Sequence, residues 1–120
     1  MAKKKILVVD DEPNVVKVVA SRLEANGYEV ITANDGEEGL VKLKSEGADL
    51  IILDVMMPKM DGYTFVKKIR ADDSISKVPV IILTAKEKMK DLFEIEGIKD
   101  YIIKPFEAKE LLEKVNKYLK

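Results

Sequence analysis

Three short runs of apolar residues constrain the fold more than any other feature of this sequence. They are ILVV (6–9), LIIL (50–53) and VIIL (80–83), each an uninterrupted run of four residues rich in β-branched side chains. Such runs, bounded by polar or turn residues, are typical of strands that are buried on both faces. Two further segments, YEVITA (28–33) and DYIIK (100–104), mix apolar and polar residues, which favours strands at the edges of a sheet.

Segments with helical periodicity and helix-end signals separate these strands. Pro13 suits the first turn of a helix and Gly27 its end. Asp35 and Glu38 have the spacing of a capping box for the next helix, which Gly47 ends. The third and the last helix repeat apolar residues at i, i+4 spacing. These residues are Phe65 and Ile69 in the third helix, and Leu111, Val115 and Leu119 in the last.

This alternation of strands and helices predicts a parallel sheet with helices on both faces and right-handed crossovers. The first, third and fourth strands are of the buried type, whereas the second and fifth are of the edge type. We therefore predict an α/β fold, a flavodoxin-like doubly wound five-stranded sheet of order 2-1-3-4-5. A length of 120 residues suits one domain, and we expect residues 1–120 to form it without a linker or an output domain.

Composition excludes several classes of function. With 21 basic and 22 acidic residues the formal net charge is −1, so we expect neither direct nucleic-acid binding nor a membrane partner. The absence of Cys and His excludes a thiol nucleophile, an imidazole base and a His or Cys metal site. The apolar run near the N-terminus is much shorter than the ~7–15 residues of a signal peptide, so we expect a cytoplasmic protein.

Polar residues stand where four of the strands end. Asp10 and Asp11 follow the first strand, Asp54 the third, Thr84 the fourth, and Lys104 ends the fifth. Because ligands of open α/β sheets bind beyond the carboxyl ends of the strands, we expect these side chains to converge there. Three carboxylates packed together repel one another unless a cation joins them. Oxygen ligands without His favour a hard ion, and Mg²⁺ above all.

Four segments together, ILVVDDEP, LIILDVMMPKMDG, VIILTA and YIIKPF, resemble a known family. The chain resembles the receiver domain of the response regulators of bacterial two-component signalling, over all 120 residues. The resemblance implies a phospho-acceptor switch that is no enzyme beyond its own phosphorylation and dephosphorylation. It implies a histidine kinase or a phosphotransfer protein as the donor, and a monomer or a weak phosphorylation-dependent dimer. It does not identify the downstream target.

The resemblance also implies roles for the acidic residues. Asp54 would be the phosphoryl acceptor, in a reaction that depends on Mg²⁺. Asp10, Asp11 and Asp54 would bind the ion, together with the backbone carbonyl of Met56.

The same resemblance assigns roles at the fourth and fifth strands. Thr84 would bond a phosphoryl oxygen, and Lys104 would pair with the phosphoryl group. Tyr101 would be the aromatic residue that turns inward on activation. The Lys104–Pro105 peptide bond would be cis.

Each of these residues also has a purely structural interpretation. Asp10 and Asp11 can cap the first helix, and Thr84 can satisfy local backbone groups. Lys104 can guard an edge strand, and Tyr101 can be a plain edge aromatic. The combination of carboxylates with Lys104 favours the functional interpretation.

Three alternative functions can be compared with the receiver. A flavodoxin would not place the acids of DDEPN (10–14) against a flavin phosphate. No GxGxxG follows the first strand, which excludes a dinucleotide-binding site there. A small aspartyl phosphatase of the haloacid-dehalogenase kind would need a second Asp where Met56 stands. The third alternative, a receiver that is part of a larger transcriptional regulator or hybrid kinase, stays open.

Two segments depart from a simple pattern. The first helix carries apolar residues over a wider arc than one buried stripe needs, so part of that arc should be exposed. Receivers dock their kinase through this helix.

The segment between Thr84 and Lys104 is shorter than the resemblance implies, and we expect a short helix of low stability within residues 86–97.

Overall fold

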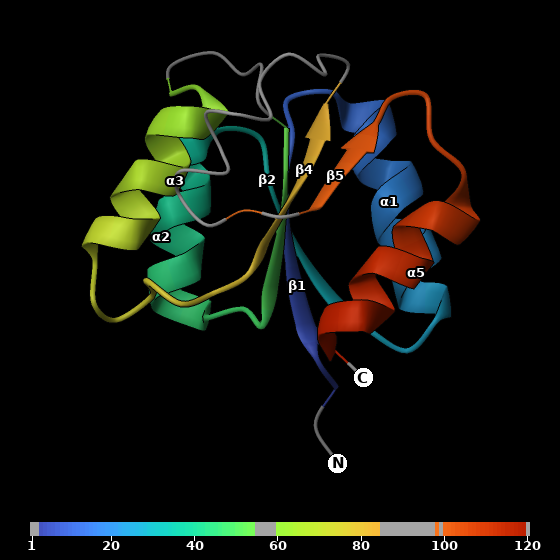
Figure 1. Ribbon diagram of the computed structural model, residues 1–120, viewed down its shortest axis with the longest axis horizontal. Helices are drawn as coiled ribbons and strands as arrows, with labels where there is room; N and C mark the ends of the chain where they lie inside the picture. Colours follow the sequence, from blue (N-terminus) through green and yellow to red (C-terminus); the bar gives the residue numbers. More distant parts are fainter. Residues whose placement is uncertain (1–2, 55–59, 85–97, 99, 120) are drawn as a thin grey trace.

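The computed structural model describes residues 3–54, 60–84, 98 and 100–119, and these form a parallel sheet between two layers of helices (Figure 1). The strands are β1 (Lys5–Val9), β2 (Glu29–Ala33), β3 (Leu50–Leu53), β4 (Val80–Thr84) and β5 (Asp100–Ile103). The helices within the described residues are α1 (Pro13–Ala25), α2 (Gly36–Glu46), α3 (Gly62–Ala71) and α5 (Ala108–Leu119). The strand order is β2-β1-β3-β4-β5, which confirms the predicted flavodoxin-like topology and both edge strands.

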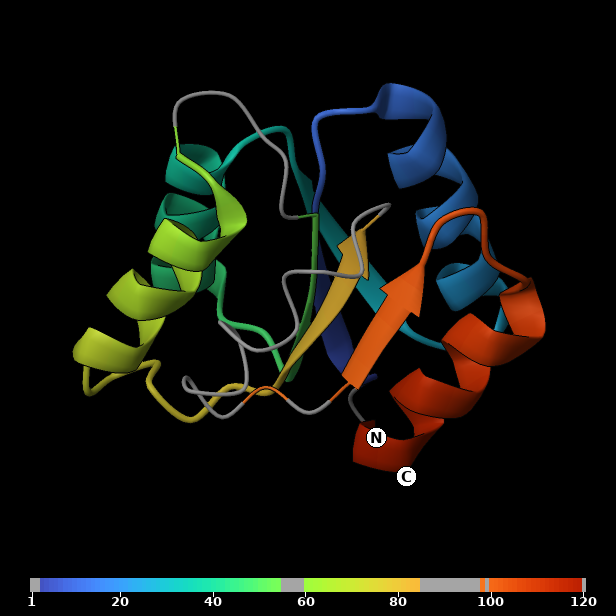
Figure 2. The same cartoon turned by 45° about the horizontal axis from the view of Figure 1, so that its top comes forward.

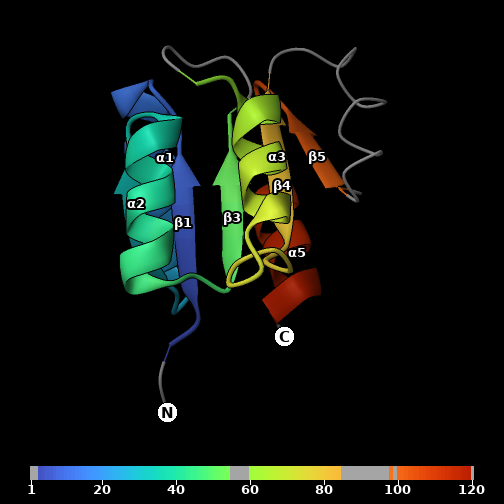
Figure 3. The same ribbon diagram turned by 90° about the vertical axis from the view of Figure 1, so that its left-hand side faces the viewer.

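Helices α1 and α5 cover one face of the sheet, and α2 and α3 cover the other (Figures 1 and 3). Successive side chains of a strand point to opposite faces, so each strand contributes to both layers of the core. Leu7 and Val9 of β1 pack under α2 and α3, whereas Ile6 and Val8 pack under α1 and α5. Residues 6–9, 50–53 and 80–83 of the inner strands are therefore all apolar, as predicted, and the only polar residues of these strands are Lys5 at the start of β1 and Thr84 at the end of β4.

Helix α1 begins and ends where the sequence predicted. Pro13 is its first residue, and Gly27 follows its end with a φ of 90°, a left-handed conformation that favours glycine. Val19 and Leu23 are buried, but 52% of Val18 is exposed. The predicted wide apolar arc is thus partly open to solvent.

The start of α2 differs in one detail from the predicted capping box. The Asp35 carboxylate accepts a hydrogen bond from the Glu38 backbone N–H at 2.8 Å, as predicted. The Glu38 carboxylate, however, accepts from the backbone N–H of Asn34 at 2.6 Å rather than from that of Asp35. Gly47, with a φ of 76°, ends the helix.

Two predicted features lie outside the described residues, and a third differs by one position. Met56 and the predicted helix within residues 86–97 lie outside the described residues. Thr84 is the last residue of β4 rather than the residue after it. In the part of the chain that the structure describes, no helix has the length and apolar character needed to cross a membrane.

Candidate functional site

Asp10 and Asp54 directly follow the neighbouring strands β1 and β3, at the carboxyl edge of the sheet. Figure 2 brings this edge forward. The residues two positions before them, Val8 and Ile52, point into the layer under α1 and α5. Because side chains alternate along a strand, the same face receives both carboxylates. Only 1% of Asp10 and 4% of Asp54 is exposed.

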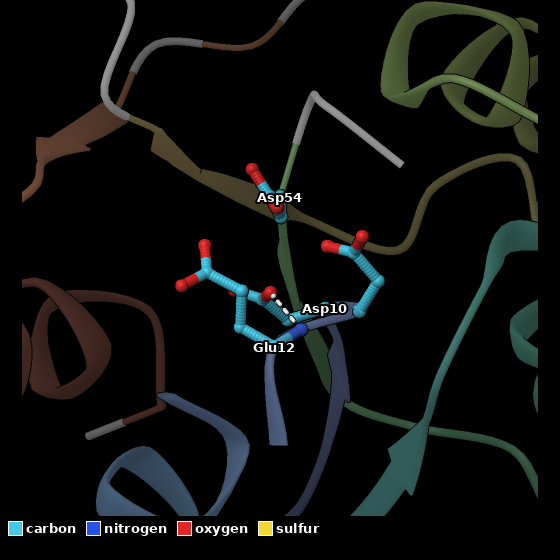
Figure 4. Close-up of side chains that lie close together, drawn as sticks. Asp10, Glu12 and Asp54 are labelled. Atoms are coloured by element: carbon cyan, nitrogen blue, oxygen red, sulfur yellow. Dashed lines mark hydrogen bonds between the residues drawn. The ribbon is translucent and has the colours of Figure 1, made fainter. Parts of the chain in front are cut away.

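Main-chain hydrogen bonds fix these two residues in position. The Asp54 backbone N–H donates to the carbonyl of Val9 at 2.9 Å, and that of Asp10 donates to the carbonyl of Ala33 at 3.2 Å. The Asp10 carboxylate accepts from the backbone N–H of Glu12 at 2.9 Å, which orders the turn into α1 (Figure 4). The main chain of both residues is therefore fixed at the ends of the strands, and the Asp10 carboxylate has a main-chain donor as well.

Lys104 follows β5 and brings a positive charge to the same place. Its Nζ lies 3.1 Å from Oδ2 of Asp10, 3.2 Å from Oε1 of Glu12 and 3.7 Å from Oδ2 of Asp54. The first two contacts are hydrogen bonds. Only 15% of the lysine side chain is exposed, so the ammonium is paired inside the site.

Burial by itself would lower the pKa of Lys104. The pKa is nevertheless raised above its ordinary value, by the hydrogen bond and the charge of Asp10 and then by the charge of Asp54 and the hydrogen bond to Glu12. The carboxylates therefore keep the amine protonated. A buried pair of aspartates with no cation would be costly, and Lys104 offsets part of that cost.

Four carboxylates gather tightly enough to hold a metal ion. One oxygen from each of Asp10, Asp11, Glu12 and Asp54 can be chosen so that all lie within 4.8 Å of one another. Figure 4 shows three of these side chains, Asp10, Glu12 and Asp54, around one point. Asp10 and Asp54 are buried, whereas Asp11 and Glu12 are exposed, so the cluster opens to solvent on one side. Such an all-oxygen donor set fits a hard divalent cation.

Glu12 is the member of the cluster for which the sequence predicted no role. The signal was its position directly after two acids and before the Pro13 that starts α1. The contact with Lys104 joins the residue before α1 to the residue after β5, which are far apart in the sequence, so no local sequence pattern predicts it.

The remaining predicted site residues come from β4 and β5. Thr84 ends β4 in register with Ile103. The Tyr101 hydroxyl donates to the carbonyl of Ile98 at 3.2 Å, and its ring packs against the core under α2 and α3. The Lys104–Pro105 peptide bond is cis.

A groove of about 700 Å³ lies between α1 and α5 and reaches the site. Its wall includes Glu12 and Lys104 at one end and the apolar side chains of α1 and the β5–α5 connection beyond them. The other lining residues are Asn14, Val15, Val18, Arg22, Pro105, Phe106 and Ala108.

Comparison with known proteins yields one family. The family model of the response regulator receiver domain matches residues 6–116. The chain is 46% identical to the probable transcriptional regulator ycf27 of Porphyra purpurea, over 98% of this chain and 48% of the relative. It is 45% identical to the alkaline phosphatase synthesis transcriptional regulatory protein PhoP of Bacillus subtilis, over 98% of this chain and 49% of the relative. It thus spans about half the length of the curated relatives it matches.

Solved structures agree. The chemotaxis protein CheY4 of Vibrio cholerae superposes with a TM-score of 0.91 at 35% identity, over 98% of this chain and 99% of that one. The receiver domain of a histidine kinase from Syntrophus aciditrophicus superposes with a TM-score of 0.87 at 31% identity, over 97% of this chain and 89% of the other. On this evidence the chain belongs to the response-regulator receiver family of two-component signalling.

Proposed function

We propose that this receiver accepts a phosphoryl group on Asp54 from a histidine kinase or a phosphotransfer protein, and that the modification changes a partner-binding surface. The observation that carries the proposal is the buried Asp54 carboxylate beside the Lys104 ammonium and the Asp10 carboxylate, with the cluster open to solvent through Asp11 and Glu12. An acid this buried, next to a fixed cation, is suited to chemistry rather than to solvation.

The proposed step is a displacement at phosphorus. An Asp54 oxygen forms a bond to phosphorus while the bond to the donor's histidine nitrogen, or to the oxygen of a small acyl phosphate, breaks and its electron pair leaves with the donor. Lys104 offsets the charge on the phosphoryl oxygens. Thr84, by family resemblance, bonds one of those oxygens.

The acidic residues fit the divalent ion that the family implies. Asp10, Asp11 and Asp54 would hold Mg²⁺ with the carbonyl of Met56, and their oxygen donors suit it. When bound, Mg²⁺ supplies positive charge against the oxygens of the transferred group. The main-chain bonds described above keep the backbone of Asp10 and Asp54 in place at the ends of β1 and β3.

The groove between α1 and α5 is the proposed contact for the donor protein. It continues directly from Lys104 and Glu12, so a phosphohistidine carried on a helix that lies in the groove would be close to Asp54. Exposed Val18 adds apolar surface there. The near-neutral charge of the chain supports a protein rather than a nucleic acid as the partner of this domain.

Incubation with acetyl phosphate and Mg²⁺, followed by intact mass measurement, tests the proposal. We expect one base-labile phosphoryl group that maps to Asp54 and disappears when the metal is chelated. Asp54→Asn should keep the fold and lose the adduct. An unchanged wild-type mass at high donor concentration would contradict the function, and an adduct on another residue would contradict the site.

We also propose, as a second candidate, that this receiver is the regulatory half of a longer transcriptional regulator. The relatives of about twice its length are named as transcriptional regulators, which favours this output over chemotaxis-like signalling. An antibody against this chain, used on extracts of the source cells, measures the length of the native product. A native product no longer than the 120-residue chain would contradict this candidate.

A further inference from the structure

Glu12 stands at the N-cap position of α1, yet its carboxylate makes no capping hydrogen bond with the helix. N-cap positions favour Ser, Thr, Asp and Asn, whose short side chains reach the free backbone N–H groups. The longer Glu12 side chain instead accepts a hydrogen bond from Lys104 Nζ at 3.2 Å. The Glu12 side chain thus pairs with Lys104 and does not cap α1.

The three carboxylates that share Lys104 differ in burial and in distance. Asp10 is buried and lies 3.1 Å from Nζ, whereas 61% of the Glu12 side chain is exposed at 3.2 Å. Asp54 is the most distant of the three, at 3.7 Å. In the unmodified protein the lysine therefore lies closer to the two carboxylates at the start of α1 than to the acceptor, although it is within ion-pair distance of all three.

We propose that Glu12 is a positioning residue that retains Lys104 while Asp54 is unmodified and releases it when Asp54 carries a phosphoryl group. The proposal rests on the proposed function. A phosphoryl group brings strong anionic acceptors to Asp54, and charge-assisted hydrogen bonds to them exceed those of a solvated ion pair. Asp10, whose side chain is 1% exposed, cannot exchange the lysine for water. Glu12 can, because water replaces the lysine at its carboxylate.

This exchange would carry the state of Asp54 to the groove between α1 and α5. Glu12 and Lys104 both line that groove, beside apolar residues such as Val15 and Phe106. Before phosphorylation its wall holds a neutral ion pair, and afterwards it holds an unpaired carboxylate. The donor protein would thus meet a different surface after it has transferred its phosphoryl group.

Chemical labelling of Lys104 tests the resting contact without any phosphorylation. The chain is pulsed with acetic anhydride at constant pH, and acetylation of Lys104 is measured by peptide mass relative to the exposed Lys109. We expect Glu12→Gln to raise the labelling of Lys104 about two- to fivefold, the size expected for loss of an exposed ion pair. Glu29→Gln, which removes a carboxylate of β2 that is 55% exposed and pairs with Lys5, is the matched control and should leave the labelling of Lys104 relative to Lys109 unchanged.

The release is tested by repeating the labelling with Mg²⁺ and beryllofluoride, a mimic of the acyl phosphate. We expect the difference between wild type and Glu12→Gln to vanish there, because Lys104 then pairs with the mimic in both proteins. A difference that persists with the mimic would overturn the release.

A double-variant cycle separates positioning from simple repulsion of the donor. Glu12→Gln should speed phosphorylation by acetyl phosphate in the wild-type background and have no effect when Lys104 is replaced by Met. An equal effect in both backgrounds would mean that Glu12 acts on the donor and not through the lysine.

Failure of this proposal and failure of the proposed function give different results. If wild type is phosphorylated but Glu12→Gln labels Lys104 like wild type, Glu12 does not hold the lysine and the function stands. If wild type takes neither phosphoryl group nor beryllofluoride, the function and the release are both contradicted, while the labelling still measures the resting contact.

Discussion

At the residue scale, the balance of charge around Lys104 decides the character of the site. Asp10 and Asp54 are nearly inaccessible to water, and one ammonium lies within 4 Å of both. Removing one partner of a buried ion pair is costly because the other charge remains buried. Asp11 is different, since it is exposed and contributes another negative charge to the cluster.

Asp11→Asn should therefore stabilise the metal-free protein while it weakens Mg²⁺ binding. Relief of one like-charge contact is worth about 1 kcal/mol, which raises the melting temperature by a few degrees in a domain of this size. Thermal unfolding in chelator, and again across a Mg²⁺ titration, measures both effects. A variant that is equally or less stable in chelator would contradict the repulsion within the cluster.

At the element scale, the start of β5 is tied to the end of α5 by Asp100. This carboxylate is 8% exposed, accepts a hydrogen bond from the Tyr118 hydroxyl and lies 3.1 Å from Lys117 Nζ. Burial by itself would raise the pKa of Asp100, but the Tyr118 and Lys117 contacts outweigh it and lower the pKa below the ordinary value. Burial and Asp100 raise the pKa of Tyr118 to about 12.

Asp100→Asn should lower the free energy of unfolding at pH 7 by about 1–2 kcal/mol, because a charged hydrogen-bond acceptor is lost. A carboxyl group with a lowered folded-state pKa stabilises the protein above its ordinary pKa of 3.8 and loses that effect as pH falls through the folded-state value. The difference between variant and wild type should therefore shrink below about pH 4. Urea unfolding at several pH values measures it.

The control for this prediction is Asp73→Asn, since Asp73 is an exposed acid in the turn between α3 and β4. Its effect should be small at every pH. A difference for Asp100→Asn that is the same at neutral and acidic pH would show that the side chain matters for packing and not for its charge.

The contact between α2 and α3 depends on a glycine within α2. A Cβ at Gly39 would lie 3.0 Å from Phe65 Cε1 and 3.1 Å from Val9 Cγ2, and both of those residues are fully buried. At Gly36 the three nearest atoms all belong to the side chain of Met60, with Sδ at 3.0 Å, Cβ at 3.1 Å and Cγ at 3.2 Å. Met60 is only partly buried, whereas both neighbours of Gly39 are held in the core.

Gly39→Ala should destabilise the protein by about 1–2 kcal/mol, because overpacking outweighs the helix propensity gained from alanine. Gly36→Ala should cost less, since the partly buried Met60 can shift toward solvent more easily than Phe65 and Val9 can shift in the core. Denaturant unfolding of both variants measures the contrast. Equal or greater stability of Gly39→Ala than of wild type would contradict the tight contact.

At the scale of the whole molecule, the two helical layers present different surfaces. The layer of α1 and α5 borders the site and carries the groove, whereas α2 lies on the opposite face (Figure 1). Among the residues that the structure describes, each layer has one large apolar residue that is more than half exposed, Val18 at 52% on α1 and Val41 at 66% on α2. These two exposed valines, one on each face, are a matched pair of sites for substitution.

Val18→Ser should slow phosphorylation by a histidine kinase several-fold and leave phosphorylation by acetyl phosphate unchanged, because loss of one apolar contact in an interface costs about 1 kcal/mol. Val41→Ser should change neither rate. The two rates, measured with a kinase shown to phosphorylate this chain, test the assignment. Equal effects of the two variants would remove the α1–α5 groove as the donor's contact.

The strands, their order and most helix ends could be predicted from the sequence pattern alone. Uninterrupted β-branched runs and mixed runs distinguished the inner strands from the edges, because burial on two faces excludes polar side chains. Pro13, Gly27 and Gly47 marked helix ends through their backbone preferences. That the acids and Lys104 meet followed from the common direction of parallel strands. The phosphoryl role of Asp54 and the roles of Met56, Thr84 and Tyr101 stay predictions.

Other features were decided only by the tertiary structure. The hydrogen bond of Glu12 to Lys104 and the tie of Asp100 to Tyr118 join side chains whose nearness depends on how α1 and α5 pack on the sheet. Sequence pattern assigns a residue to a strand end or a helix face. It does not choose among the partners that a long charged side chain can reach, because that choice depends on the burial and charge of every neighbour in the folded chain.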